Sequence, residues 1–212
     1  MRDPPSIPQY YRTRRKEGAN LRPMLAAAVI PCLLAGCSHP VRVTAFTQGP
    51  PGGPPIARIA VAPAPGSIPA SIAHILEREG YAVDDPAATE GLLAAHHLGG
   101  HPVEEPEVLR ALASEGVDAV LIAVSDYPGW ALKSPKYVDI RFFPPEKVAV
   151  RVVRTTSGDV VTAFVWENAL CAMRGSPCDT RAKRPVSEAA RQVADLVLRT
   201  IGPPPARPDS KR

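Results

Sequence analysis

The sequence is poor in aromatic residues and in cysteine, and it has no long apolar run. Only 11 of its 212 residues are Phe, Trp or Tyr, and four are Cys. The most apolar segment, Met24–Ala35, has twelve residues and is interrupted by Pro31, whereas a membrane-spanning helix needs about 20 apolar residues. We therefore expect no transmembrane helix.

The familiar signatures of catalysis are also missing. The chain has no nucleophile elbow, no helical His-Glu-x-x-His motif and no glycine-rich phosphate loop, because Gly52-Gly53 does not lie between a strand and a helix. Ser67 follows a glycine but is expected to cap a helix, and Asp84-Asp85 are typical turn formers. We predict that the protein is not an enzyme and carries no cofactor.

The excess of positive charge is confined to the amino terminus. Residues 1–36 hold six of the 25 Lys and Arg residues but only two of the 21 Asp and Glu residues, which leaves 19 of each sign in residues 37–212. A neutral domain has no electrostatic attraction to a phosphate backbone. We therefore expect no nucleic-acid partner.

The amino terminus is typical of a bacterial lipoprotein signal peptide. A basic region through Arg22 precedes the apolar segment, which ends in Leu34-Ala35-Gly36-Cys37. Lipoprotein signal peptidase requires small residues before the cut and a cysteine thiol to carry the diacylglycerol. We expect residues 1–36 to be removed and Cys37 to be lipidated. The alternative is an ordinary secretory peptide that happens to contain this cysteine.

An even pair of cysteines, Cys171 and Cys178, remains once Cys32 is removed and Cys37 is lipidated. In an oxidising compartment such a pair usually forms a disulfide, and closing so short a loop would stabilise the fold by roughly 2–3 kcal/mol. Two buried free thiols are the alternative.

Composition divides the mature chain into a tether, one domain and a tail. Residues 37–55 begin at the lipidated cysteine and are rich in Gly, Pro and small polar residues, so they are expected to form an extended spacer of about 55 Å that holds the domain away from the membrane. Residues 56–202 carry the periodic apolar patterns of one folded domain. Residues 203–212 begin with a run of prolines and are expected to be a disordered tail.

The patterns within residues 56–202 predict an α/β fold. Apolar runs or alternation predict strands at 56–62, 81–83, 117–124, 138–142, 148–152 and 160–166. Helical periodicity predicts helices at 67–80, 89–97, 106–116 and 187–201. The nearly continuous apolar run at 117–124 indicates a strand covered on both faces. We predict a single domain with a mixed, partly antiparallel sheet flanked by helices, in the order β-α-β-α-α-β-β-β-β-α.

Several phrases, taken with the anchored cysteine and the closing amphipathic helix, resemble a known family. They are "IARIAVAPAPGSIPASIAHILEREGYAVDD", "LRALASEGVDAVLIAVSDY" and the hairpin "VAVRVVRTTSGDVVTAFVWEN". The pattern resembles the curli-secretion (CsgG-like) lipoproteins, with the TolB amino-terminal domain and the penicillin-binding-protein activator lipoproteins as relatives in fold. The resemblance implies an outer-membrane lipoprotein whose periplasmic domain forms rings or docks onto other envelope proteins.

Two details refine what this resemblance implies. Pore-forming members carry long insertions that become membrane strands, whereas only residues 125–146 lie between the inner strands of this chain, which favours a non-pore adaptor. Ser38 stands where an aspartate would retain a lipoprotein in the inner membrane, so the expected location is the outer membrane, facing the periplasm.

Three histidines, His96, His97 and His101, lie close together in sequence, with Glu104 and Glu105 just beyond. Clusters of this kind can bind zinc or copper. Adjacent histidines on a helix point in different directions, however, so a solvated helix end is the favoured interpretation. A periplasmic metal-binding lipoprotein that uses the His96–His101 cluster remains the alternative function.

Five of the 11 aromatic residues fall within residues 127–143, in a segment rich in proline. Exposed aromatic side chains favour protein contacts or a membrane interface, and filling of the core is the alternative. We assign Tyr127, Trp130 and Tyr137 to partner binding. The predicted function is a non-catalytic binding or assembly module for an envelope secretion or assembly machine, which acts with an envelope protein partner or as a homo-oligomer.

Overall fold

The computed structural model describes residues 42–48, 53–127, 144–169 and 183–205. Its elements are β1 (Arg42–Gln48), β2 (Arg58–Val61), α1 (Ile68–Arg78), β3 (Ala82–Asp84), α2 (Pro86–Ala95), α3 (Pro106–Ser114), β4 (Ala119–Asp126), β5 (Lys147–Arg154), β6 (Val160–Glu167) and α5 (Val186–Ile201). They belong to one structural unit, Ser38–Arg212. None of the helices in the described ranges is both long and apolar enough to span a bilayer.

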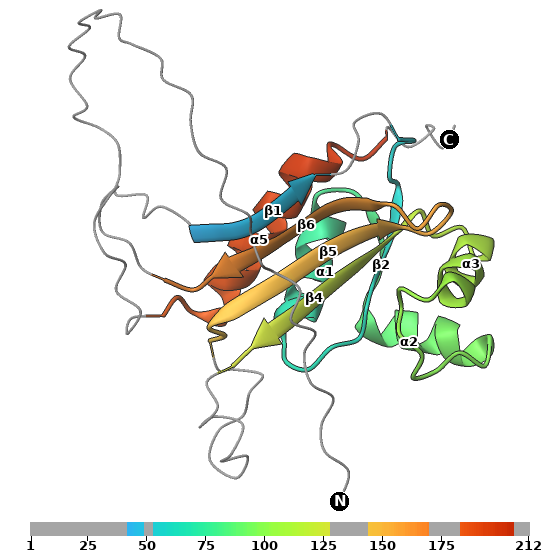
Figure 1. Ribbon diagram of the computed structural model, residues 1–212, viewed down its shortest axis with the longest axis horizontal. Helices are drawn as coiled ribbons and strands as arrows, with labels where there is room; N and C mark the ends of the chain where they lie inside the picture. The colour runs from blue at the N-terminus through green and yellow to red at the C-terminus, as the bar shows by residue number, and fades with distance from the viewer. Residues whose placement is uncertain (1–41, 49–52, 128–143, 170–182, 206–212) are drawn as a thin grey trace, which may run out of the picture. The chain divides into compact units, whose positions relative to one another are not determined.

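Six strands form one mixed sheet in the order β1-β6-β5-β4-β2-β3 (Figure 1). β2 runs parallel to β3 and to β4, whereas β4, β5, β6 and β1 pair with their neighbours in antiparallel orientation. The parallel part requires helical crossovers, and the antiparallel part includes the β5–β6 hairpin. The predicted single-domain α/β fold with a mixed, partly antiparallel sheet is confirmed.

Alternation along the strands builds a core on each face of the sheet. In β2, Ile59 and Val61 face α1 and α5, while Ala60 faces α2 and α3, as the two-residue period of a strand requires. The larger core also contains Phe164 and Trp166 of β6. Figure 1 shows α1 and α5 behind the sheet, with α2 and α3 beside β2 and β4.

The amino-terminal strand corrects the predicted tether. Residues 37–55 were expected to form a continuous spacer, but Arg42–Gln48 form β1 and pair with β6 from Arg42↔Glu167 to Gln48↔Thr162. Valine and threonine in this stretch favour extended backbone, and β6 offers a free edge for pairing. The prediction of an extended spacer is therefore wrong for this stretch.

The helices cover one face of the sheet only in part. α2 and α3 pack against β2 and the first half of β4, so Val120 is buried whereas Val124 on the same face is 51% exposed. Its register partner Ala149 on β5 is also exposed. The expectation that the whole run 117–124 is covered on both faces is therefore wrong at Val124. The strand predicted at 138–142 lies outside the described residues.

Candidate functional site

A groove of about 600 Å³ lies where this partly covered face meets the loop between α2 and α3. Ala62 and Pro63, just after β2, and Ile122 and Val124 of β4 line it on the sheet side. β2 and β4 are parallel neighbours, and ligands of α/β proteins commonly bind beyond the carboxyl ends of such strands. The volume is in the range of pockets that hold small molecules or side chains of a partner.

The groove has an apolar floor because β4 continues beyond the helices that cover it. Ile122 is half-buried, and Val124 is the one large apolar side chain among the described residues that is mainly exposed. Leu93 of α2 and Val103 of the α2–α3 loop add apolar surface on the opposite wall. This arrangement can accept an apolar group but offers few hydrogen bonds to a polar one.

One ion pair crosses the mouth of the groove. Arg151 of β5 places Nη1 2.6 Å from Oε1 of Glu104 in the α2–α3 loop, and both side chains are more than 40% exposed. An exposed pair contributes only about 0–1 kcal/mol, so it can exchange partners with an arriving ligand. Glu90 of α2 also lines the groove. The site therefore combines apolar walls with charged groups at its edge.

The histidine cluster does not converge on one point. His96 Nε2 lies 2.8 Å from Oε1 of Glu115, and His101 Nδ1 lies 3.0 Å from Oε2 of Glu105. His97 has a positive φ of 60°, which turns the backbone between the other two. No group of three or more His, Cys, Asp or Glu residues in the described part of the chain could hold a metal. The structure thus separates the side chains on which the metal-binding alternative depends.

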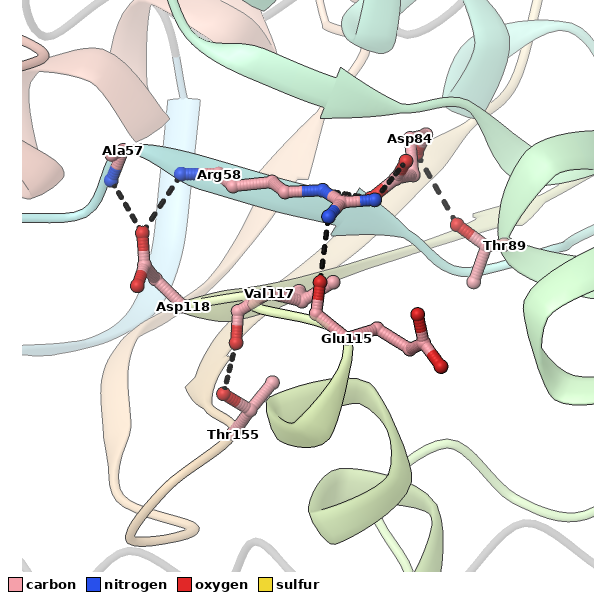
Figure 2. Close-up of polar contacts among 8 residues, drawn as sticks. All are labelled: Ala57, Arg58, Asp84, Thr89, Glu115, Val117, Asp118 and Thr155. Atoms are coloured by element: carbon pink, nitrogen blue, oxygen red, sulfur yellow. Dashed lines mark hydrogen bonds and ion pairs between the residues drawn. The ribbon is translucent and has the colours of Figure 1, made fainter. Parts of the chain in front are cut away.

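A polar network fixes the other end of strands β2 and β4 (Figure 2). The guanidinium of Arg58 donates to both carboxylate oxygens of Asp84 at 2.9 Å and to the carbonyl oxygen of Glu115. Its hydrogen bonds with Asp84 raise the pKa of Arg58 above its ordinary value. Asp118 Oδ2 accepts from the amides of Ala57 and Arg58 at 2.7 and 2.8 Å. The network ties three strands together where the groove does not reach.

The two aspartates expected to form a turn have different roles in the structure. Asp85 accepts a hydrogen bond from the amide of Ala88 at 2.8 Å and so caps α2, which agrees with the predicted structural role. Asp84 instead reaches back to Arg58. Sequence reasoning missed this pair, because the two residues lie on neighbouring parallel strands and no local pattern links them.

A second buried hub lies beyond the end of β6. The side chain of Asn168 donates to the carbonyl oxygens of Pro145 and Arg184 and accepts from the amide of Arg184. Arg184 is 5% exposed and donates to the carbonyl oxygen of Ala169 at 2.7 Å. Burial lowers the pKa of Arg184. The hub joins the entry of β5 to the start of α5.

Of the residues predicted to bind a partner, the structure describes only Tyr127. Its side chain is 6% exposed, and its hydroxyl occupies the space where a side chain at Gly66 would begin. Gly66 has a φ of +93°, so this turn requires glycine for both reasons. The burial of Tyr127 gives it a place in the core and does not suit a partner-binding anchor.

The other predicted site residues lie outside the described residues. They are the lipidation residue Cys37, the disulfide pair Cys171 and Cys178, and the partner-binding residues Trp130 and Tyr137. Their assignments stay predictions. The groove itself was not predicted, because it is assembled from four segments that are distant in sequence.

No protein-family model matches the sequence, and no curated protein matches it at a significant level. The chain is similar to several solved structures. One is the PelC dodecamer from Paraburkholderia phytofirmans: the identity is 14%, the match covers 76% of this chain and 96% of that chain, and the TM-score is 0.39. A second is TolB from Acinetobacter baumannii, with 9% identity, coverage of 76% of this chain and 31% of that chain, and a TM-score of 0.39. A third is lipoprotein GNA1162 from Neisseria meningitidis, with 20% identity, coverage of 68% of this chain and 96% of that chain, and a TM-score of 0.38. TolB was among the fold relatives predicted from the sequence, but these values are too low to carry a function to this chain.

Proposed function

We propose that the protein is a lipoprotein anchored through Cys37 to the outer membrane, and that its periplasmic domain is a non-catalytic binding module for an envelope assembly or secretion machine. The observation that carries the binding role is the open groove beside β4, where Val124 is 51% exposed. Grooves with mainly apolar walls at the carboxyl ends of parallel strands are common places for binding.

The charged edge of the groove supports a protein partner. The pair formed by Arg151 and Glu104 is exposed and weak, and interfaces commonly combine an apolar centre with a polar rim. Small neighbours such as Ala149 leave Val124 accessible to a partner's side chain. The partner is an envelope protein or a second copy of this chain.

The anchor is tested by labelling cells with radioactive palmitate. The wild-type chain should incorporate the label and fractionate with the outer membrane, whereas Cys37→Ser should take up none and remain unprocessed. The matched variant Ser38→Asp should keep the label but move the protein to the inner membrane. Label in Cys37→Ser would contradict the lipoprotein assignment, and Ser38→Asp that stays in the outer-membrane fraction would contradict the sorting.

The binding role is tested by a photocrosslinking residue placed at Val124 in living cells. It should form a defined adduct with an envelope protein or a second copy. The same photocrosslinking residue placed at Ala149 should also form an adduct, and adding Val124→Glu to that protein should abolish it. The control position is Asp195, an exposed residue of α5. A binding role for the groove would be contradicted if probes at Val124 and Ala149 formed no adduct, or if a probe at Asp195 formed the same adducts.

A further inference from the structure

The start of β1 lies close in sequence to the proposed lipid anchor. β1 begins at Arg42, and only residues 38–41 separate it from Cys37. Five residue steps span at most about 18 Å when fully extended. The Cα of Arg42 therefore cannot lie farther than this from the lipidated cysteine, whereas a spacer through residue 55 would have allowed a much greater distance.

Pairing in the sheet places a row of charged residues at the level of Arg42. In the strand register, Arg42 lies opposite Glu167 of β6, Glu167 lies opposite Lys147 of β5, and Lys147 lies opposite Asp126 of β4. We call these four residues the charged row. It lies at one end of the antiparallel part of the sheet and extends about 14 Å from β1 to β4. The link from Cys37 joins the sheet at Arg42, which is the first residue of this row.

The charged row carries two cations that are paired with Glu167 and about half-exposed to solvent. The side chains of Arg42 and Lys147 are each 52% exposed, and Glu167 holds them at 2.8 and 3.7 Å. Arg and Lys are the side chains that bind phosphate oxygens. Two cations and two anions leave the row without net charge, so an anionic bilayer does not repel it.

We infer that the domain stands on the membrane with the charged row facing the lipid headgroups, and that Arg42 and Lys147 contact the phosphates. This inference rests on the proposed lipidation of Cys37. It assigns the opposite end of the sheet, with the β5–β6 turn at Ser157 and the network around Asp118, to the side away from the bilayer. The groove at Val124 lies two residues before Asp126 on β4, near the lipid surface.

The test uses the lipidated full-length protein in vesicles of phosphatidylethanolamine and phosphatidylglycerol that contain a headgroup nitroxide quencher. A fluorescent noncanonical residue replaces Lys147 in one sample, where Arg42 remains to contact the phosphates, and Ser157 in another. β5 separates the two positions by more than about 23 Å along the strand, so quenching should be at least about threefold stronger at position 147. Inserting ten Gly and Ser residues after Ser38 should reduce quenching at position 147 while the protein still floats with the vesicles.

Flotation separates failure of this inference from failure of the anchor. Protein that does not float with vesicles lacks the lipid, which would overturn the proposed function. Protein that floats but is quenched equally at both positions, or more strongly at Ser157, would overturn the orientation. Unchanged quenching at position 147 after the insertion would show that the short link does not hold the charged row at the membrane, and would overturn the inference as well.

Discussion

The carboxylate of Asp118 is the group in the polar network whose removal tests the structure most directly. It accepts from two consecutive backbone amides, those of Ala57 and Arg58, at 2.7 and 2.8 Å. The backbone bond from the Asp118 amide to the Arg58 carbonyl oxygen, 2.9 Å long, does not depend on the side chain. Asp118→Ala therefore removes two hydrogen bonds without removing the local strand pairing.

The expected cost follows from the exposure of the two amides. A hydrogen bond to a charged group contributes about 1.5–3 kcal/mol, but Ala57 is exposed and water can replace its acceptor, whereas Arg58 is half-buried. We therefore expect Asp118→Ala to lower the free energy of unfolding by about 2–3 kcal/mol. For a domain of this size that corresponds to a melting temperature lower by about 5–10 °C.

The assay is thermal and urea unfolding of the domain, with two comparison variants. Asp118→Asn keeps one oxygen acceptor and loses the charge, so it should recover about half of the lost stability. Asp195→Ala removes an exposed carboxylate of α5 and should change stability by less than about 0.5 kcal/mol. If Asp118→Ala unfolds like Asp195→Ala, the reasoning about these two amides is refuted.

Four further predictions concern the core, the titration of a buried phenol, the disulfide and the undescribed aromatic residues. Trp166 is fully buried and its Nε1 donates to Gln192, so Trp166→Ala should cost about 3–5 kcal/mol in urea unfolding, and a loss below about 1 kcal/mol would contradict its place in the core. Burial raises the pKa of Tyr127. The stability that this shift contributes is therefore complete below the unfolded pKa of about 10 and is lost as pH rises through the folded pKa. Between about pH 9 and pH 11, the free energy of unfolding should fall less in Tyr127→Phe than in wild type, and equal falls would contradict this expectation. Mass spectrometry of protein made in the periplasm should find Cys171 bonded to Cys178, and two free thiols would overturn that pairing. Trp130→Ala should weaken association by about 2 kcal/mol or more in sedimentation while the melting temperature stays near wild type; a large drop in melting temperature with normal association would return this residue to the core.

The fold could be predicted where local patterns agree with the tertiary structure. The helix predicted at 67–80 is α1 (Ile68–Arg78), and the final helix predicted at 187–201 is α5 (Val186–Ile201). Both present one apolar stripe to the sheet, and turn-forming residues mark their ends. α2 begins at Pro86, earlier than the predicted 89, because Asp85 caps it there.

The strand β1 was missed because of the residues that follow it. Prolines and glycines at 49–55 suggested a spacer, and they concealed seven residues before them that contain neither. A run of this length with valine, threonine and phenylalanine is a signal for a strand. Its partner strand β6, however, lies more than 100 residues later in the sequence, so the strand depends on a pairing that no local pattern shows.

The groove was hidden from sequence for a similar reason. Val124 belongs to a continuous apolar run, and only the lengths and positions of α2 and α3 decide that it stays exposed. The histidines suggested a site because they are neighbours in sequence. His96 and His101 pair with different carboxylates, Glu115 and Glu105. Proximity along the chain therefore did not produce a group that could hold a metal among the described residues.

The pairing of β1 with β6 also has a consequence for the order of folding. Arg42 and Glu167 are register partners, and contacts between residues so far apart in sequence form late because closing a long loop is slow. An exported chain releases β1 first, but β1 can join the sheet only after nearly all of the domain has followed. During that interval β1 has no partner strand, so the proposed signal-peptide cleavage and lipid attachment at Cys37 can be completed before β1 pairs with β6.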